Sequence, residues 1–143
     1  MPTPQPTVLT DAYIAVNGTA LSAWANQVAL TDTSDQVEVT GFGTAGYRSY
    51  IKGLATAQVA VTFFQDFQNN GIDQTLQPLY ASGGTFALEV RPTSAAASVT
   101  NPKYTMTARL YEWSPINGAV GAADTISVTF ANAGTAGLVR GTS

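Results

Sequence analysis

Residues 36–66 read QVEVTGFGTAGYRSYIKGLATAQVAVTFFQD, and this stretch carries two signals that point to different folds. Residues 41–46, GFGTAG, match the glycine pattern that holds a dinucleotide pyrophosphate. Asp66 lies about twenty residues further on, where such a site needs an acid for the ribose. Residues 59–63 instead alternate apolar and smaller side chains, which is typical of a strand with one buried face. The rest of the chain decides between the two.

The glycine match lacks the elements that a nucleotide site requires. A dinucleotide-binding fold places a helix of about a dozen residues after the glycines, because the N-terminus of that helix holds the phosphate. Here only residues 47–52 lie between Gly46 and Gly53, and a strand has begun by Gln58. No further strand–helix unit follows. We therefore interpret the glycines as a flexible turn after an edge strand.

Period-two alternation recurs along the chain and predicts an antiparallel β-protein. It is broken once, in residues 70–80, by helical spacing that predicts a short amphipathic helix between two strands. The alternating segments, separated by turn residues, predict a sandwich or barrel; they are residues 14–16, 28–30, 37–39, 59–63, 86–90, 104–110 and 126–130.

The signals at the ends of the helix can be read from its residues. Asn70 is expected to cap it, with Asp73 favourable near its positive end. Pro78 is expected to bend or end its regular part, and residues 83–84, Gly-Gly, to stop it. The apolar face is expected to consist of Ile72, Leu76, Leu79 and Tyr80.

Composition excludes the commonest catalytic and metal chemistry. The 143 residues, which suggest one domain, include no cysteine and no histidine. Disulfides, thiolate zinc sites, cysteine nucleophiles and Ser-His-Asp triads are therefore absent. Charged residues make up only 10% of the chain, compared with about 25% in ordinary soluble proteins. A surface of Thr, Ser and Ala in their place suits a subunit that copies of itself will cover.

Charge and hydropathy set further limits. The net charge of −3 offers nothing that would attract nucleic acid by counterion release. No run of 18 apolar residues predicts a transmembrane helix. The first residues, MPTPQPT, have neither a basic region nor an apolar core, so we expect no signal peptide.

The remaining candidate sites have simpler structural interpretations. Asp32 and Asp35 could bind calcium, but a polar turn is favoured because more oxygen ligands would be needed. Asp66 and Asp73 flank the start of the helix and are interpreted as capping it. The nine acids single out no pair for glycoside hydrolysis. Tyr111 and Trp113 could stack on a sugar, but a core edge or a subunit interface is favoured. We predict no enzyme, cofactor or metal site.

The order of elements resembles that of phage tail tube proteins, the major tail proteins of long-tailed bacteriophages. Three stretches carry the resemblance: DAYIAVNGTALSAW with its Asn17-Gly18 hairpin turn, residues 36–66, and PKYTMTARLYEWSPINGAVGAADTISVTFANAG. Together they cover nearly the whole chain past residue 10. The fold class implied is mainly β, an antiparallel sandwich or barrel-like tail-tube fold with one short flanking α-helix.

The chain is expected to have three parts. Three prolines near the start predict an extended N-terminal arm over residues 1–10, the tail-tube domain would span residues 11–132, and the Gly-rich residues 133–143 predict a flexible C-terminal tail. The resemblance also implies a function. Subunits would close into hexameric rings that stack into a hollow conduit for DNA ejection, with DNA and a tape-measure protein in the lumen without sequence-specific binding. Tail tip and terminator proteins would be partners. The location would be the virion tail, after assembly in the host bacterial cytoplasm.

Loops, terminal segments and isolated cations are the expected contacts between subunits. Residues 41–46 are expected to form a mobile loop that orders against a neighbour. Two alternatives stay open: another virion β-protein, such as a tail terminator or head decoration subunit, and a monomeric carbohydrate-binding or adhesin sandwich. The predicted interface residues are Thr3, Thr7, Gly43, Gly46, Arg48, Lys52, Arg91, Thr93, Val99, Arg109, Ile116, Val120, Leu138 and Arg140.

Overall fold

The computed structural model describes residues 2–143; Met1, part of the predicted N-terminal arm, lies outside the described residues. Two short 3-10 turns, Ser22–Trp24 and Phe42–Thr44, accompany the regular elements. Those elements are β1 (Tyr13–Val16), β2 (Thr19–Ala20), β3 (Ala25–Glu38), β4 (Tyr50–Phe64), α1 (Ile72–Ser82), β5 (Phe86–Arg91), β6 (Lys103–Leu110), β7 (Thr125–Asn132) and β8 (Val139–Gly141).

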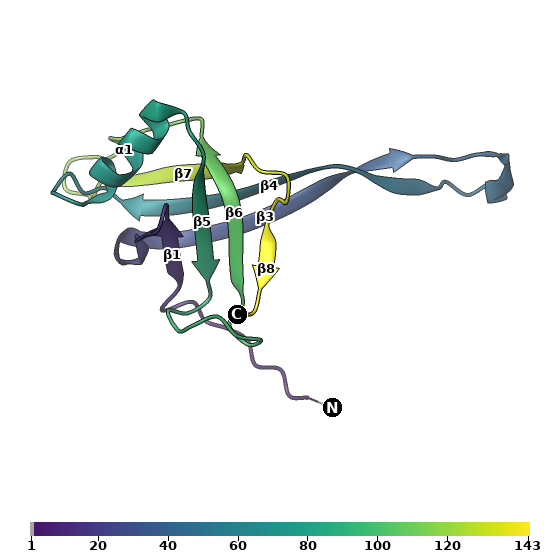
Figure 1. The fold of residues 1–143 in the computed structure, drawn as a ribbon, viewed down its shortest axis with the longest axis horizontal. Helices are drawn as coiled ribbons and strands as arrows, with labels where there is room; N and C mark the ends of the chain where they lie inside the picture. The colour runs from purple at the N-terminus through teal and green to yellow at the C-terminus, as the bar shows by residue number, and fades with distance from the viewer. Residues whose placement is uncertain (1) are drawn as a thin grey trace.

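The strands form one continuous antiparallel sheet that folds over on itself. Within the described residues its order is β2-β1-β5-β6-β7-β4-β3, and β8 pairs with β6. In Figure 1 β1, β5 and β6 cross the direction of β7, β4 and β3. The ring of Phe86 on β5 meets that of Phe130 on β7 edge-on, with centroids 5.9 Å apart, although β6 lies between these strands in the sheet. The two halves of the sheet therefore face each other.

The core lies between these halves and follows the predicted alternation. On β5, Phe86, Leu88 and Val90 are buried, and on β7 so are Ile126, Val128 and Phe130. On β4, burial alternates from Ala57 to Phe63. Helix α1 adds Ile72 and Leu76 to the same cluster. The predicted antiparallel strands and the single flanking helix are confirmed.

The helix differs from the prediction at its ends. Gly71, and not Asn70, is the N-cap, and no side chain caps the helix. Asn70 has a φ of 64° and belongs to the turn before it. The helix continues through Pro78 to Ser82 and ends, as predicted, at Gly83 in the left-handed conformation. Pro78 is tolerated because it is exposed, so water can reach the carbonyl that it leaves without a partner. Tyr80, expected on the apolar face, is also exposed.

Two strands depart from the sequence pattern. Residues 28–30 and 37–39 were expected as separate segments, but residues 25–38 form one strand, β3. Strand β8 lies within residues 133–143, where a flexible tail was expected, and it pairs with Lys103–Thr105 of β6. The pattern missed β8 because three residues, Val139–Gly141, are too few to show alternation.

Candidate assembly interface

A long β-hairpin projects from the body, and its outer part, residues 34–55, is here called the arm (Figure 1). Direct pairing between β3 and β4 runs from Ala25 opposite Phe63 to Glu38 opposite Tyr50. At 14 and 15 residues these strands exceed the usual length of about 3–10. Strand β7 pairs with β4 only from Gln58 to Phe64, so the arm is a two-stranded ribbon.

The glycine-rich stretch that matches a nucleotide motif is the tip of this arm. Residues 42–44 form one 3-10 turn, and Ala45 and Gly46 reverse the chain with φ values of 53° and 87°. The tip leads back into β4, as the interpretation of a turn after an edge strand predicts. That this turn is mobile and orders against a neighbour stays a prediction.

Gly53 shapes the arm below its tip. The register shifts between Ser34 and Gln36, where β4 has one extra residue opposite β3. A Cβ atom on Gly53 would lie 2.7 Å from Cγ2 of Val37 and 3.1 Å from Cβ of Asp35. Only glycine therefore fits this bulge without displacing β3.

The arm exposes apolar side chains that the rest of its own chain does not cover. Val37 and Ile51 are cross-strand partners on one face, and Ile51 is 56% exposed. Leu54 is 83% exposed and Tyr47 is 79% exposed. Phe42, in the tip, is fully exposed. An isolated two-stranded ribbon is marginally stable in water, so we expect another molecule to cover this surface.

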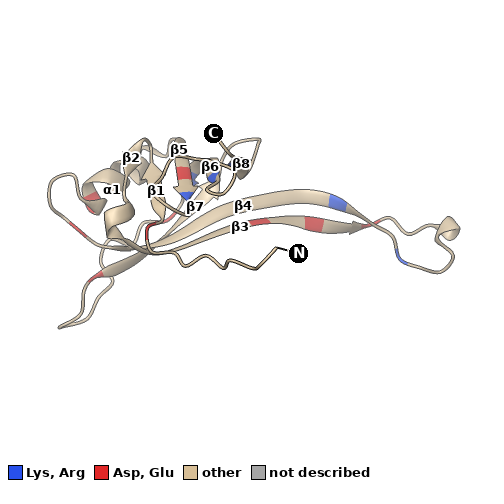
Figure 2. Cartoon of the chain, turned by 90° about the horizontal axis from the view of Figure 1, so that it is seen from below, with Lys and Arg blue, Asp and Glu red and all other residues tan. Residues whose placement is uncertain are grey.

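The charges of the arm are divided between its two strands (Figure 2). Within the arm, strand β3 carries Asp35 and Glu38 and no cation, and Asp32 lies on the same strand just before the arm begins. Strand β4 carries Lys52 and no anion, and Arg48 lies in the loop before it. Within residues 2–143 the one ion pair closer than 4.0 Å is Arg91–Glu89, at 3.9 Å, which lies outside the arm. The arm charges are thus available to another molecule.

A second group of predicted interface residues lies where the two termini and the β5–β6 loop meet. Thr3 and Thr7 belong to an exposed segment without helix or strand, and Arg140 is exposed on β8. Leu138 lines an apolar groove of about 360 Å³, together with Leu9, Val28 and Leu30.

Arg91, at the edge of this groove, is held by its own chain. Its guanidinium carbon lies 4.0 Å from the centroid of the Tyr13 ring, and Nη1 donates to the Ala95 carbonyl at 2.8 Å. Its interactions with Tyr13, Ala95 and Glu89 lie within one subunit; whether it also contacts another copy stays a prediction.

The β5–β6 loop is organised by one buried polar side chain. Asn101 is 7% exposed; its Oδ1 accepts from the Thr93 amide, and its Nδ2 donates to the carbonyls of Ala95 and Ala96. Thr93 is therefore half-buried, while Val99 is exposed at the turn of the loop. Of these two predicted contacts, only Val99 presents its side chain freely.

A third region is the β6–β7 loop, which includes Tyr111 and Trp113, the two aromatic residues considered for sugar stacking. Ile116 and Val120 are exposed there. Tyr111 is exposed, whereas Trp113 packs against the core, as expected for a core edge. Arg109, on β6, is half-buried, and among the described atoms its Nε is a buried donor without a partner.

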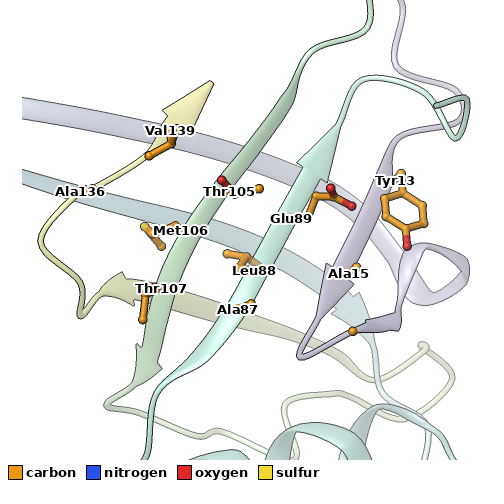
Figure 3. Close-up of a pocket in the computed structure, with 12 residues that line it drawn as sticks. Tyr13, Ala15, Ala87, Leu88, Glu89, Thr105, Met106, Thr107, Ala136 and Val139 are labelled. Atoms are coloured by element: carbon orange, nitrogen blue, oxygen red, sulfur yellow. The ribbon is translucent and has the colours of Figure 1, made fainter. Parts of the chain in front are cut away.

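A shallow depression on the outer side of β1, β5 and β6 contains no set of groups for catalysis (Figure 3). Its volume is about 390 Å³, and it is lined mainly by small or uncharged side chains such as Ala15, Ala87 and Thr107. Glu89 is its one carboxylate. Within residues 2–143 no three acids, cysteines or histidines group together to hold a metal ion.

The aspartates that the sequence offered as calcium ligands or helix caps lie in strand β3 and around the start of helix α1. Asp32 and Asp35 lie on β3, so the polar turn expected around them is wrong. Oδ2 of Asp66 accepts from Nε1 of Trp24 at 2.9 Å, and Oδ1 accepts from the Gln68 amide. The Asp66 carbonyl accepts from the Asp73 amide, which ties it to the start of α1. None of the helices in residues 2–143 has the length and hydropathy to cross a membrane.

Comparisons with known proteins show the fold class. No protein-family model matches the chain. No curated protein matches it either. A chain from the virion of a native gene transfer agent (GTA) particle superposes with a TM-score of 0.74 at 12% identity, covering 94% of this chain and 99% of that one.

Two further structures are tails. A chain from the tail of an empty GTA particle with C6 symmetry gives a TM-score of 0.68 at 12% identity, covering 90% of this chain and 92% of that one. A chain from the SPP1 tail tube gives a TM-score of 0.72 at 14% identity, covering 96% of this chain and 80% of that one. The chain therefore has a tail-tube fold, which confirms the fold class that the resemblance implied.

Proposed function

We propose that this chain is a structural subunit of a virion tail tube. Copies would close into six-membered rings, and the rings would stack into a hollow conduit for DNA. The observation that carries the proposal is the agreement of the fold with tail and tail-tube chains over 90% or more of this chain. The C6 symmetry of one of these tails supports the number of subunits per ring.

The chain's own geometry supports the same function. A monomer with a long exposed edge strand such as β3 risks uncontrolled pairing, and natural monomers often protect such edges with Lys or Pro, neither of which β3 contains. Here the arm offers free edges and uncovered apolar side chains, which suits a subunit that its neighbours complete. A ring that repeats along an axis produces a filament.

The proposed role is mechanical, without catalysis. A net charge of −3 fits a conduit in which DNA must slide and must not be held. DNA and a tape-measure protein would occupy the lumen, and tip and terminator proteins would close the ends. The tail would be assembled in the host bacterial cytoplasm.

The predicted interface residues take roles in this arrangement. Gly43, Gly46, Arg48 and Lys52 would contact a neighbour through the arm. Adjacent subunits or rings would contact the region where the two termini meet, with Thr3, Thr7, Leu138 and Arg140. They would also contact the β5–β6 loop through Val99 and the β6–β7 loop through Ile116 and Val120.

Electron microscopy of the purified, concentrated protein tests the proposal, with its mass in solution measured alongside. We expect tubes or stacked six-fold rings. Closed single rings or trimers would favour a terminator or decoration subunit. A protein that stays monomeric, even with added tail tip, and then scores in a glycan screen would overturn the proposal in favour of a binding module.

A further inference from the structure

We infer that Asn117, in the β6–β7 loop, is a site of spontaneous chemical modification, at which the side-chain amide is lost and a carboxylate is formed. The chain contains the sequence Asn-Gly three times, at residues 17–18, 70–71 and 117–118. In this sequence the main-chain nitrogen of the glycine can attack the asparagine side chain, because glycine has no Cβ atom to obstruct the approach. The structure holds two of these pairs in place and leaves the third free to react.

The reaction proceeds through a succinimide ring and needs no reactant other than water. The main-chain nitrogen of Gly118 bonds to Cγ of Asn117, the bond from Cγ to the side-chain nitrogen breaks, and ammonia leaves with the proton of the Gly118 amide. Water then opens the ring at one of its two carbonyl carbons and returns a proton to the Gly118 nitrogen. Opening at Cγ gives aspartate. Opening at the main-chain carbon gives isoaspartate, in which the main chain is longer by one carbon atom.

The first Asn-Gly pair is held in a tight turn between two paired strands. Asn17 and Gly18 have φ values of 51° and 81°, and Val16 pairs with Thr19 across the turn. The Asn17 amide donates to the Ala87 carbonyl at 2.7 Å. The ring can close only if the peptide between Asn17 and Gly18 rotates, and this rotation would break the turn.

The second pair is held at the start of helix α1. Gly71 is buried and is the N-cap of the helix, and its amide donates to the Gln68 carbonyl at 3.0 Å. A Cβ atom on Gly71 would lie 2.6 Å from the main-chain oxygen of Asp66, so there is little space around this residue. Attack on Asn70 would therefore require the start of the helix to open.

The third pair has neither restraint. Asn117 and Gly118 are exposed and belong to neither helix nor strand. Among residues 2–143 neither the Gly118 amide nor the Asn117 side chain has a hydrogen-bond partner. The main-chain amide of Asn117 donates to Oδ1 of Asp124 at 2.8 Å, a contact that holds the residue but not the peptide that follows it. This peptide can rotate at low cost, as reaction requires.

The modification would change the surface of the β6–β7 loop. It adds one negative charge to a chain with a net charge of −3, at a residue next to the exposed Ile116. The new carboxylate belongs to the residue whose amide Asp124 binds, and like charges so close together weaken that contact. The chemistry itself does not depend on the proposed function. If the loop contacts other copies as proposed, subunits modified before assembly should join less well.

Peptide mapping by mass spectrometry tests the inference, since trypsin places the three pairs on separate peptides, residues 1–48, 53–103 and 110–140. Dilute protein would be incubated at mildly alkaline pH, both folded and in urea. Each modified residue would be located by fragmentation from its gain of about 1 Da. In the folded chain Asn117 should react at least about tenfold faster than Asn17 and Asn70, whereas in urea the three rates should agree within about threefold. A smaller excess in the folded chain, or the same excess in urea, would overturn the inference.

A glycine variant tests the route of the reaction. Gly118→Ala adds a methyl group that would lie 3.4 Å from Cα of Asp124, an ordinary contact, so the loop should keep its structure. The methyl group should slow the loss of the Asn117 amide at least about tenfold. Gly41→Ala, the same change at an exposed glycine that follows no asparagine, is the matched control and should leave the rate unchanged. An unchanged rate in Gly118→Ala would exclude the succinimide route.

The effect on assembly is tested separately by Asn117→Asp, which carries the charge of one product. It should lower the yield of tubes at least about twofold. Tubes at the wild-type yield would overturn the effect on assembly. Modification of Asn117 in a chain that forms no tubes would support the site and count against the tail tube.

Discussion

Replacing the arm by a tight turn should abolish assembly and leave the body folded. Thr33 and Thr56 are direct cross-strand partners. Deleting residues 34–55 and inserting Asn-Gly therefore leaves a two-residue hairpin loop, a length and sequence that favour the type I′ turn. The design removes the arm at a point where the register of the body is intact.

The expected change in stability is small because the arm contributes nothing to the core. None of residues 34–55 is buried, and the buried part of β4 begins at Ala57. Shortening the connection roughly tenfold lowers the entropic cost of closing it by about 2 kcal/mol. The exposed hydrogen bonds of the arm contribute little net free energy to folding, so their loss costs little. The deletion also removes the entropic cost of ordering the residues that made them. The free energy of unfolding should stay within about 2 kcal/mol, or about 8 °C in Tm.

Thermal melts by circular dichroism, the mass in solution, and electron microscopy would measure these effects together. Ile51→Thr is the milder companion variant, since it keeps a β-branched residue and removes apolar contact area. It should lower the yield of tubes without changing the melt. If the shortened chain lost more than about 15 °C in Tm, the arm would belong to the folding unit. If it formed tubes at the wild-type yield, the arm would not be an assembly element.

Other perturbations test the body and its loops. Phe130→Ala should lower the free energy of unfolding by about 3–5 kcal/mol in urea titrations, because the buried ring also contacts Phe86; a loss below about 1 kcal/mol would contradict the folded-over sheet. Asn101→Ala should cost about 1–3 kcal/mol, because it leaves amide and carbonyl groups of the loop without partners; an unchanged midpoint would show that water replaces them. The Ser94 hydroxyl and amide both donate to the Asp11 carboxylate and lower its pKa. The stability from this contact is therefore present above the ordinary pKa of Asp and is lost as the pH falls through the lowered value. In an NMR titration Ser94→Ala should raise the pKa of Asp11, and no change would contradict the contact.

The sequence predicted the body well because burial leaves a period-two pattern. Alternation over residues 86–90 and 126–130 became β5 and β7, and the glycine at residue 83 ended the helix as expected. The Asn17-Gly18 turn also forms, with both residues at positive φ between β1 and β2. In each case a local signal and a tertiary contact agree.

The arm escaped prediction because its strands face no core. Residues 31–40 are exposed throughout, so no buried face distinguishes one register or one strand boundary from another. The residue spacing did contain a signal: apolar residues at 37 and 39, and at 51 and 54, lie on either side of the glycine-rich turn, which is typical of a hairpin. Sequence reasoning named Arg48 and Lys52 but not the exposed Phe42, Ile51 and Leu54 beside them.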